Sequence, residues 1–191
     1  GSAFKPIAFA LAVERGFPQN EMLLDAPVAF RGAGPGKDWR PSNFSGKFKG
    51  EMTMREALAV SQNIPAVRLI EKLGPEAVAT FAHQLGIDSP LKPNLTLVLG
   101  SSGVTLTELT SSYAVFPNRG QYVEPFGIVE VMDRSGRIMW RAKPKKQVVM
   151  SRAGAAIVTN MLEAVVKEGT GRKAQVLDRP VGGKTGTTND F

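Results

Sequence analysis

The chain has 191 residues, of which 42% are apolar, and its 24 basic and 17 acidic residues give a formal charge of +7. This length and composition predict one domain with a sizeable core and exclude a disordered chain. The sequence has no cysteine and only one histidine, His83, which excludes disulfides, thiolate metal sites and a histidine-based triad, so we predict neither a metal nor a cofactor.

The first predicted element is a helix over residues 4–15, which has Pro6 in its first turn and stops at Gly16. Its apolar run is too short to cross a bilayer and ends at Glu14 and Arg15, so no transmembrane or signal segment is predicted. Residues 19–50 are rich in Gly, Pro, Asn and Ser and predict a long loop, which in a compact domain is usually functional.

Further helices are predicted where capping residues or prolines precede an amphipathic stretch that ends near glycine or proline. Capping boxes T-x-x-E stand at Thr53 and at Thr105, and Ser151 is suited to cap a long helix. The predicted helices cover residues 55–60, 65–73, 75–85, 106–116 and 152–168. His83 falls on one of them and is expected to be a surface or packing residue.

Between the last two helices, residues 134–152 hold seven Lys or Arg residues, no acid, and Trp140. One interpretation is a patch for nucleic acid or an anionic surface. We favour two short strands around a Ser-Gly turn with the basic side chains in solvent, and expect no nucleic-acid partner.

The tetrad "SAFK" places Ser2 three residues before Lys5, so that on a helix the amine can reach the hydroxyl. This is the geometry of a nucleophile and its base. The tetrad alone does not decide the matter, because S-x-x-K occurs by chance and a leading Gly-Ser is also left by cloning.

Two further motifs follow in order, "SQN" at 61–63 and "KTG" at 184–186. S-x-x-K, S-D-N and K-T-G together are the signature of penicillin-binding proteins and class A β-lactamases, here with Gln62 in place of the Asp. Across nearly its whole length the chain resembles the transpeptidase domain of class A, bifunctional penicillin-binding proteins. The stretches that carry the resemblance are "GSAFKP", W-x-P-x-N at 39–43, "REALAVSQNIPAV", "GVTLTELTSSYAVFPNRG", "EGTG" and "GGKTGTTND".

The resemblance implies an α+β fold of α/β/α layers, in which helices flank an antiparallel sheet and "KTGT" forms a strand beside the cleft. Residues 1–191 are then a partial transpeptidase domain with a complete helical subdomain and an incomplete sheet, and alone they are expected to bind penicillin poorly. A membrane anchor and a glycosyltransferase domain are expected outside this piece. The implied location is the periplasmic or extracytoplasmic face of the bacterial inner membrane.

The resemblance also assigns catalytic roles. Ser2 would be the nucleophile and Lys5 its base, provided that burial and a nearby cation, Lys184, disfavour the charged amine. Ser61 would relay a proton to the leaving amine.

Substrate binding is assigned in the same way to a second set of residues. Asn63 would hold the backbone amide of the substrate, and Lys184, Thr185 and Thr187, with Gly186 between them, would bind its terminal carboxylate along the strand. The backbone N–H groups of Ser2 and Thr187 would form the oxyanion hole. Trp39, Pro41 and Asn43 of the long loop are assigned no catalytic role.

The function expected is a peptidoglycan D,D-transpeptidase that acts on D-Ala-D-Ala stem peptides and is acylated by β-lactams. One alternative is a serine β-lactamase, for which we find no glutamate to activate water; another is a β-lactam sensor that does not turn over. Deacylation rate and transpeptidation with a donor peptide separate these three. A fourth, a basic structural or adhesion module with degenerate motifs, is excluded if Ser2 is labelled by a fluorescent penicillin.

Overall fold

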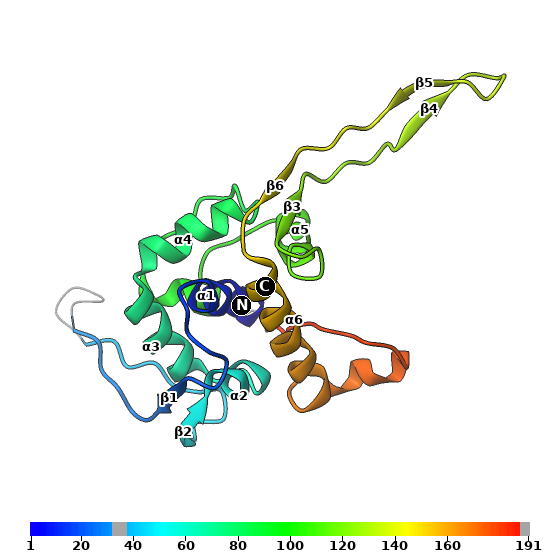
Figure 1. Ribbon diagram of the computed structural model, residues 1–191. Helices are drawn as coiled ribbons and strands as arrows, with labels where there is room; N and C mark the ends of the chain where they lie inside the picture. Colours follow the sequence, from blue (N-terminus) through cyan, green and yellow to red (C-terminus); the bar gives the residue numbers. More distant parts are fainter. Residues whose placement is uncertain (32–37, 188–191) are drawn as a thin grey trace.

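The computed structural model describes residues 1–31 and 38–187, and groups its helices around one central helix, with short strands at the edge (Figure 1). The α-helices are α1 (Lys5–Glu14), α2 (Met54–Ala59), α3 (Asn63–Leu73), α4 (Pro75–Gln84), α5 (Leu106–Ala114) and α6 (Arg152–Lys167). The 3-10 helices are η1 (Ser2–Phe4), η2 (Leu95–Leu99) and η3 (Arg172–Leu177). The strands are β1 (Met22–Asp25), β2 (Gly50–Thr53), β3 (Gln121–Val123), β4 (Glu130–Met132), β5 (Ile138–Arg141) and β6 (Lys146–Val148).

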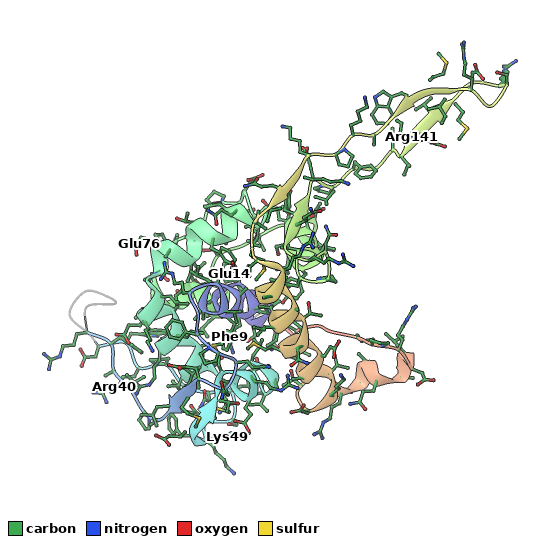
Figure 2. All side chains as sticks on the ribbon, in the orientation of Figure 1. Phe9, Glu14, Arg40, Lys49, Glu76 and Arg141 are labelled. Carbon is green, nitrogen blue, oxygen red and sulfur yellow. The ribbon has the colours of Figure 1, made fainter. Side chains whose placement is uncertain are left out.

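The central helix is α1, whose residues from Lys5 to Val13 are all buried. It packs against α3, α4 and α6, and Phe9, halfway along it, lies in the middle of the helical body (Figure 2). A helix that is apolar on every side is stable only inside a core. The residues at its first turn are therefore held from all directions, and η1, which begins with Ser2, directly precedes them.

Three of the other helices begin at the capping residues that the sequence predicted. Thr53 and Thr105 both form complete capping boxes, at the N-termini of α2 and α5, and the Ser151 hydroxyl accepts a hydrogen bond from the backbone N–H of Gly154 at the start of α6. The helix predicted from Pro65 begins two residues earlier, at Asn63, because proline is tolerated anywhere in the first turn.

The segment predicted as one long loop, residues 19–50, contains the strand β1 and ends at the first residue of the strand β2. β1 and β2 pair antiparallel, with Leu23 opposite Met52, and both of these side chains are buried against the core. Between them Phe30 and Trp39 form an isolated bridge with their rings 5.7 Å apart. The loop prediction was therefore wrong over β1, and it ends where β2 begins.

The predicted hairpin is confirmed, and it projects far from the helical body (Figure 1). β4 pairs with β5, and β3 pairs with β6 nearer the body. Two of its basic residues form ion pairs on the hairpin itself, Arg137 with Asp133 and Arg141 with Glu130. Every residue of β5, Trp140 included, is exposed.

The mixed α+β class is confirmed. The strands of the described residues form three separate antiparallel pairs, β1 with β2, β3 with β6, and β4 with β5. In the same part of the chain, every helix is too short or too polar to pass through a bilayer.

Candidate active site

Ser2 lies in the single turn of η1 that leads into α1. Two contacts fix this turn: the Tyr113 hydroxyl donates to the carbonyl oxygen of Ala3 at 2.6 Å, and η2 packs against η1. Gly100, at the end of η2, has φ 74°, and a β-carbon there would lie 2.1 Å from the backbone nitrogen of Gly1. Only glycine fits this approach.

Lys5, the first residue of α1, is fully buried. Its Nζ donates to the Ser61 carbonyl oxygen and to Asn63 Oδ1, both at 2.7 Å, and lies 3.4 Å from Ser61 Oγ. Burial, and next the charge of Lys184, lower the pKa of Lys5 to about 7. Near neutral pH this amine therefore exists both charged and neutral.

Lys184 reaches the same point from the far end of the sequence. Its Nζ donates to Ser61 Oγ at 2.7 Å and to the Thr185 carbonyl oxygen at 3.1 Å. Burial lowers the pKa of Lys184 to about 8. Ser61 therefore stands between two lysines, and it adopts φ 62°, a conformation that residues with a β-carbon rarely take.

A cavity of about 420 Å³ opens over these residues. It is lined by Ser2, Phe44, Ser45, Val60, Ser61, Gln62, Asn63, Leu99, Thr170, Thr185 and Thr187. The structure thus brings all eight predicted site residues together: five line the cavity, Lys5 and Lys184 hydrogen-bond to Ser61, and Gly186 packs beside Ala3.

The strand predicted at residues 184–187 is not formed. A strand needs a neighbour to pair with, and in the described ranges this segment pairs with none. The end of the "GGKTGTTND" stretch, residues 188–190, lies outside the described residues.

Sequence reasoning gave no role to several residues of the cavity. Thr170 belongs to the quoted "EGTG" stretch, and its hydroxyl shares a hydrogen bond of 2.6 Å with the Thr185 hydroxyl. Phe44 follows the W-x-P-x-N motif and is 97% exposed at the cavity. Its place directly after the W-x-P-x-N motif was the only sequence signal that could have pointed to it.

The cavity thus combines a serine in its lining, a buried lysine with a lowered pKa and a second lysine joined to the first through Ser61, which are the kinds of group that nucleophilic acyl transfer requires. The sequence matches the family described as the penicillin binding protein transpeptidase domain over residues 1–191, and the chain belongs to this family.

Individual relatives agree with this assignment. The chain is 40% identical to penicillin-binding protein 1A of Aquifex aeolicus over 191 residues, which is all of this chain and 26% of that protein. A crystal structure of penicillin-binding protein 1A from Haemophilus influenzae superimposes with a TM-score of 0.90 at 28% identity, covering 99% of this chain and 34% of that one. PonA1 of Mycobacterium tuberculosis, solved in complex with penicillin V, gives 0.75 at 28% identity, covering 87% and 46%. The chain thus spans about a quarter of the length of the curated relative.

Proposed function

We propose that this chain is part of a peptidoglycan D,D-transpeptidase that forms a serine acyl-enzyme with D-Ala-D-Ala stem peptides and is acylated by β-lactams. The observation that carries the proposal is Lys5, a fully buried amine with a pKa near 7, placed three residues after the cavity-lining Ser2. An amine that is partly neutral at physiological pH is suited to take a proton from a hydroxyl.

The hydrogen bonds of Lys5 support its role as base. A neutral amine has two N–H donors and one lone pair, and the two short bonds, to the Ser61 carbonyl and to Asn63 Oδ1, use both donors. The lone pair then remains for the proton of Ser2. Ser2 Oγ attacks the penultimate D-Ala carbonyl carbon, the proton passes to Lys5, and a tetrahedral oxyanion forms.

Ser61 is placed to return the proton. Its Oγ accepts from Lys184 and lies within reach of Lys5, so its own hydrogen is free to go to the leaving amine of D-Ala while Lys5 reprotonates it. The C–N bond breaks and the acyl group stays on Ser2. An amine of a second stem peptide then attacks the ester and restores the Ser2 hydroxyl.

The remaining site residues suit the recognition of the substrate. Lys184 brings positive charge beside the Thr185 and Thr187 hydroxyls, a combination that binds a terminal carboxylate. Asn63 lines the cavity and would hold the backbone amide. The backbone N–H groups of Ser2 and Thr187 would bind the oxyanion, and losing one such donor typically slows acyl transfer by about 100- to 1000-fold.

The lining of the cavity favours a transpeptidase over a β-lactamase. Hydrolysis of an acyl-enzyme needs a base to activate water, and none of the cavity-lining side chains within residues 1–31 and 38–187 is a carboxylate. The acyl-enzyme should therefore persist until an amine acceptor arrives.

The relatives' greater length supports a wider proposal: a glycosyltransferase domain and a membrane anchor elsewhere in the natural protein, with this domain on the extracytoplasmic face of the membrane. Both curated relatives are named penicillin-binding protein 1A, and the chain covers 26% of one and 27% of the other.

The experiment is covalent labelling of the natural chain that contains residues 1–191 with a fluorescent penicillin. Ser2→Ala should abolish labelling, whereas Ser45→Ala, a change at another cavity-lining serine, should retain it. Decay of the label over hours, together with cross-linking of a donor stem peptide, would identify a transpeptidase. Decay within seconds would identify a β-lactamase, and a stable label without cross-linking would identify a sensor.

A further inference from the structure

A buried polar cluster adjoins the "SQN" turn and takes no part in the chemistry described above. Its centre is Asp25, the last residue of β1, which is fully buried. The Asp25 carboxylate accepts three hydrogen bonds: from Asn43 Nδ2 at 2.7 Å, from Gln62 Nε2 at 2.6 Å and from the Lys49 backbone N–H at 2.9 Å. Both oxygens of this buried carboxylate therefore have at least one hydrogen-bond donor.

Asn43 connects this carboxylate to helix α3. Its Oδ1 accepts from the backbone N–H groups of Asn63 and Ile64, at 2.9 and 3.2 Å, which are the first two of α3. The residue preceding the helix, Gln62, makes no capping bond of its own because its side chain is turned to Asp25. A loop residue 20 positions upstream therefore caps α3.

The orientation of the Asn43 amide is fixed by its partners. Its Nδ2 donates to Asp25 and to the Lys47 carbonyl oxygen, so its oxygen can only face the helix N-terminus. A flipped amide would turn an N–H group toward two other N–H groups.

The residues held in this way are the ones that orient Lys5. Ser61, with its unusual φ of 62°, stands directly before the anchored Gln62, and its carbonyl oxygen accepts from Lys5. Asn63 is tied through its backbone to Asn43 and through its Nδ2 to the Ser42 carbonyl oxygen, while its Oδ1 accepts from Lys5. Both short hydrogen bonds of Lys5 therefore end on groups that the cluster fixes.

We propose that Asp25 and Asn43 are positioning residues for the acyl transfer, which act by holding the Ser61 carbonyl and Asn63 Oδ1 where they orient the Lys5 amine. This role rests on the proposed function. It also gives the asparagine of the W-x-P-x-N motif a task, although that residue does not line the cavity.

The chemistry of the pair supplies a test by exchange. Asn43→Asp keeps the acceptor for α3 but sets a second carboxylate against Asp25. Asp25→Asn replaces one acceptor oxygen by an N–H donor. That donor then faces either the Nδ2 donor of Asn43 or the donors of Gln62 and Lys49, so at least one hydrogen bond is lost. In the double variant D25N/N43D, the new amide donates to the new carboxylate and its oxygen accepts from Gln62 and Lys49. The one contact that stays unfavourable is between the new carboxylate and the Lys47 carbonyl oxygen, which loses its donor.

The measurement is the first-order rate of acylation at saturating fluorescent penicillin, per active molecule and well below the melting temperature. It is made on the natural chain that contains residues 1–191. The control is Ser151→Ala, which removes the cap of α6 beside Glu14, the last residue of α1, whereas Lys5 is the first. This control lowers thermal stability without touching the "SQN" turn, so its acylation rate should equal that of the wild type.

Each single variant is expected to acylate about 10- to 100-fold more slowly, the cost of displacing a catalytic group by about 1 Å. The double variant should recover most of that loss. Single variants that acylate at the wild-type rate, or a double variant as slow as the slower single, overturn the proposal. If the wild type labels normally while the variants contradict the expectation, only the positioning role fails and the proposed function stands. If the wild type forms no covalent adduct, the positioning role and the proposed function both fail.

Discussion

Replacing Lys184 by glutamine is expected to move the pH at which the site becomes reactive. The Nζ atoms of Lys5 and Lys184 lie 3.4 and 2.7 Å from Ser61 Oγ, so they are at most about 6 Å apart. Two unit charges at that distance repel by about 1.4 to 2.8 kcal/mol for an effective dielectric constant of about 40 to 20. This corresponds to about 1 to 2 pKa units.

The sign follows from which form of Lys5 acts. Only the neutral amine takes a proton, so acylation at saturating concentration rises with pH through the Lys5 pKa of about 7 and then levels off. At low concentration the rate should fall again above about pH 8, where Lys184 loses the charge that binds the carboxylate. Without the Lys184 charge the pKa of Lys5 should rise to about 8 to 9, because burial, the larger cause, is unchanged. At pH 7 the neutral fraction then falls by about 5- to 50-fold.

The assay is the rate of labelling by fluorescent penicillin from pH 5.5 to 9.5, at low and at saturating concentration. Loss of carboxylate binding raises the concentration needed for saturation, whereas loss of the charge moves the midpoint of the pH profile. Lys184→Arg is the matched control, because arginine keeps the positive charge and should keep the midpoint near 7. A midpoint near 7 in Lys184→Gln would refute the electrostatic coupling between the two lysines.

Three further results are expected. Between pH 7 and 10 the unfolded chain holds a proton on Lys5 that the folded chain has lost, so the wild type should become more stable relative to Lys5→Met as the pH rises. The difference between their unfolding free energies should grow by up to about 1.4 kcal/mol per pH unit. A difference that stays constant with pH in urea titrations would contradict the lowered pKa. Gly100→Ala should cost about 2 kcal/mol or more by overpacking against Gly1, whereas Gly103→Ala, with open space around it, should change the melting temperature little. Hydrogen bonds lower the pKa of Glu108 to about 2, so its contribution to stability is present above about pH 4.5 and is lost toward pH 2; Glu108→Gln should unfold with a weaker dependence on pH in this range, and an unchanged acid transition would argue against it.

The helices were predictable because their ends are coded locally. Thr53, Thr105 and Ser151 each satisfy backbone groups within three residues, and such signals need no knowledge of the rest of the chain. β1 and β2 were missed because their pairing joins segments separated by a loop, and four-residue strands within Gly- and Pro-rich sequence carry little pattern.

The candidate site likewise has residues that local motifs predict and residues that only the tertiary structure brings together. Ser2, Lys5, Ser61 and Lys184 stand in short motifs whose joint occurrence is specific, and the structure brings them together although 123 positions separate Ser61 from Lys184. Asp25 has no such motif: it ends a short strand, and its partners come from two other parts of the chain. A supporting shell of this kind exists only in the tertiary structure.

The complete burial of α1 has a consequence for how this domain can change over generations. A substitution between Ile7 and Val13 meets packed neighbours on every side, so it disturbs folding as well as the placement of Ser2 and Lys5. Exposed residues of the cavity, such as Phe44 and Thr170, carry no such constraint. Variants that alter which acyl donors react, while keeping a folded and working domain, are therefore expected to accumulate around the mouth of the cavity and to spare the helix beneath it.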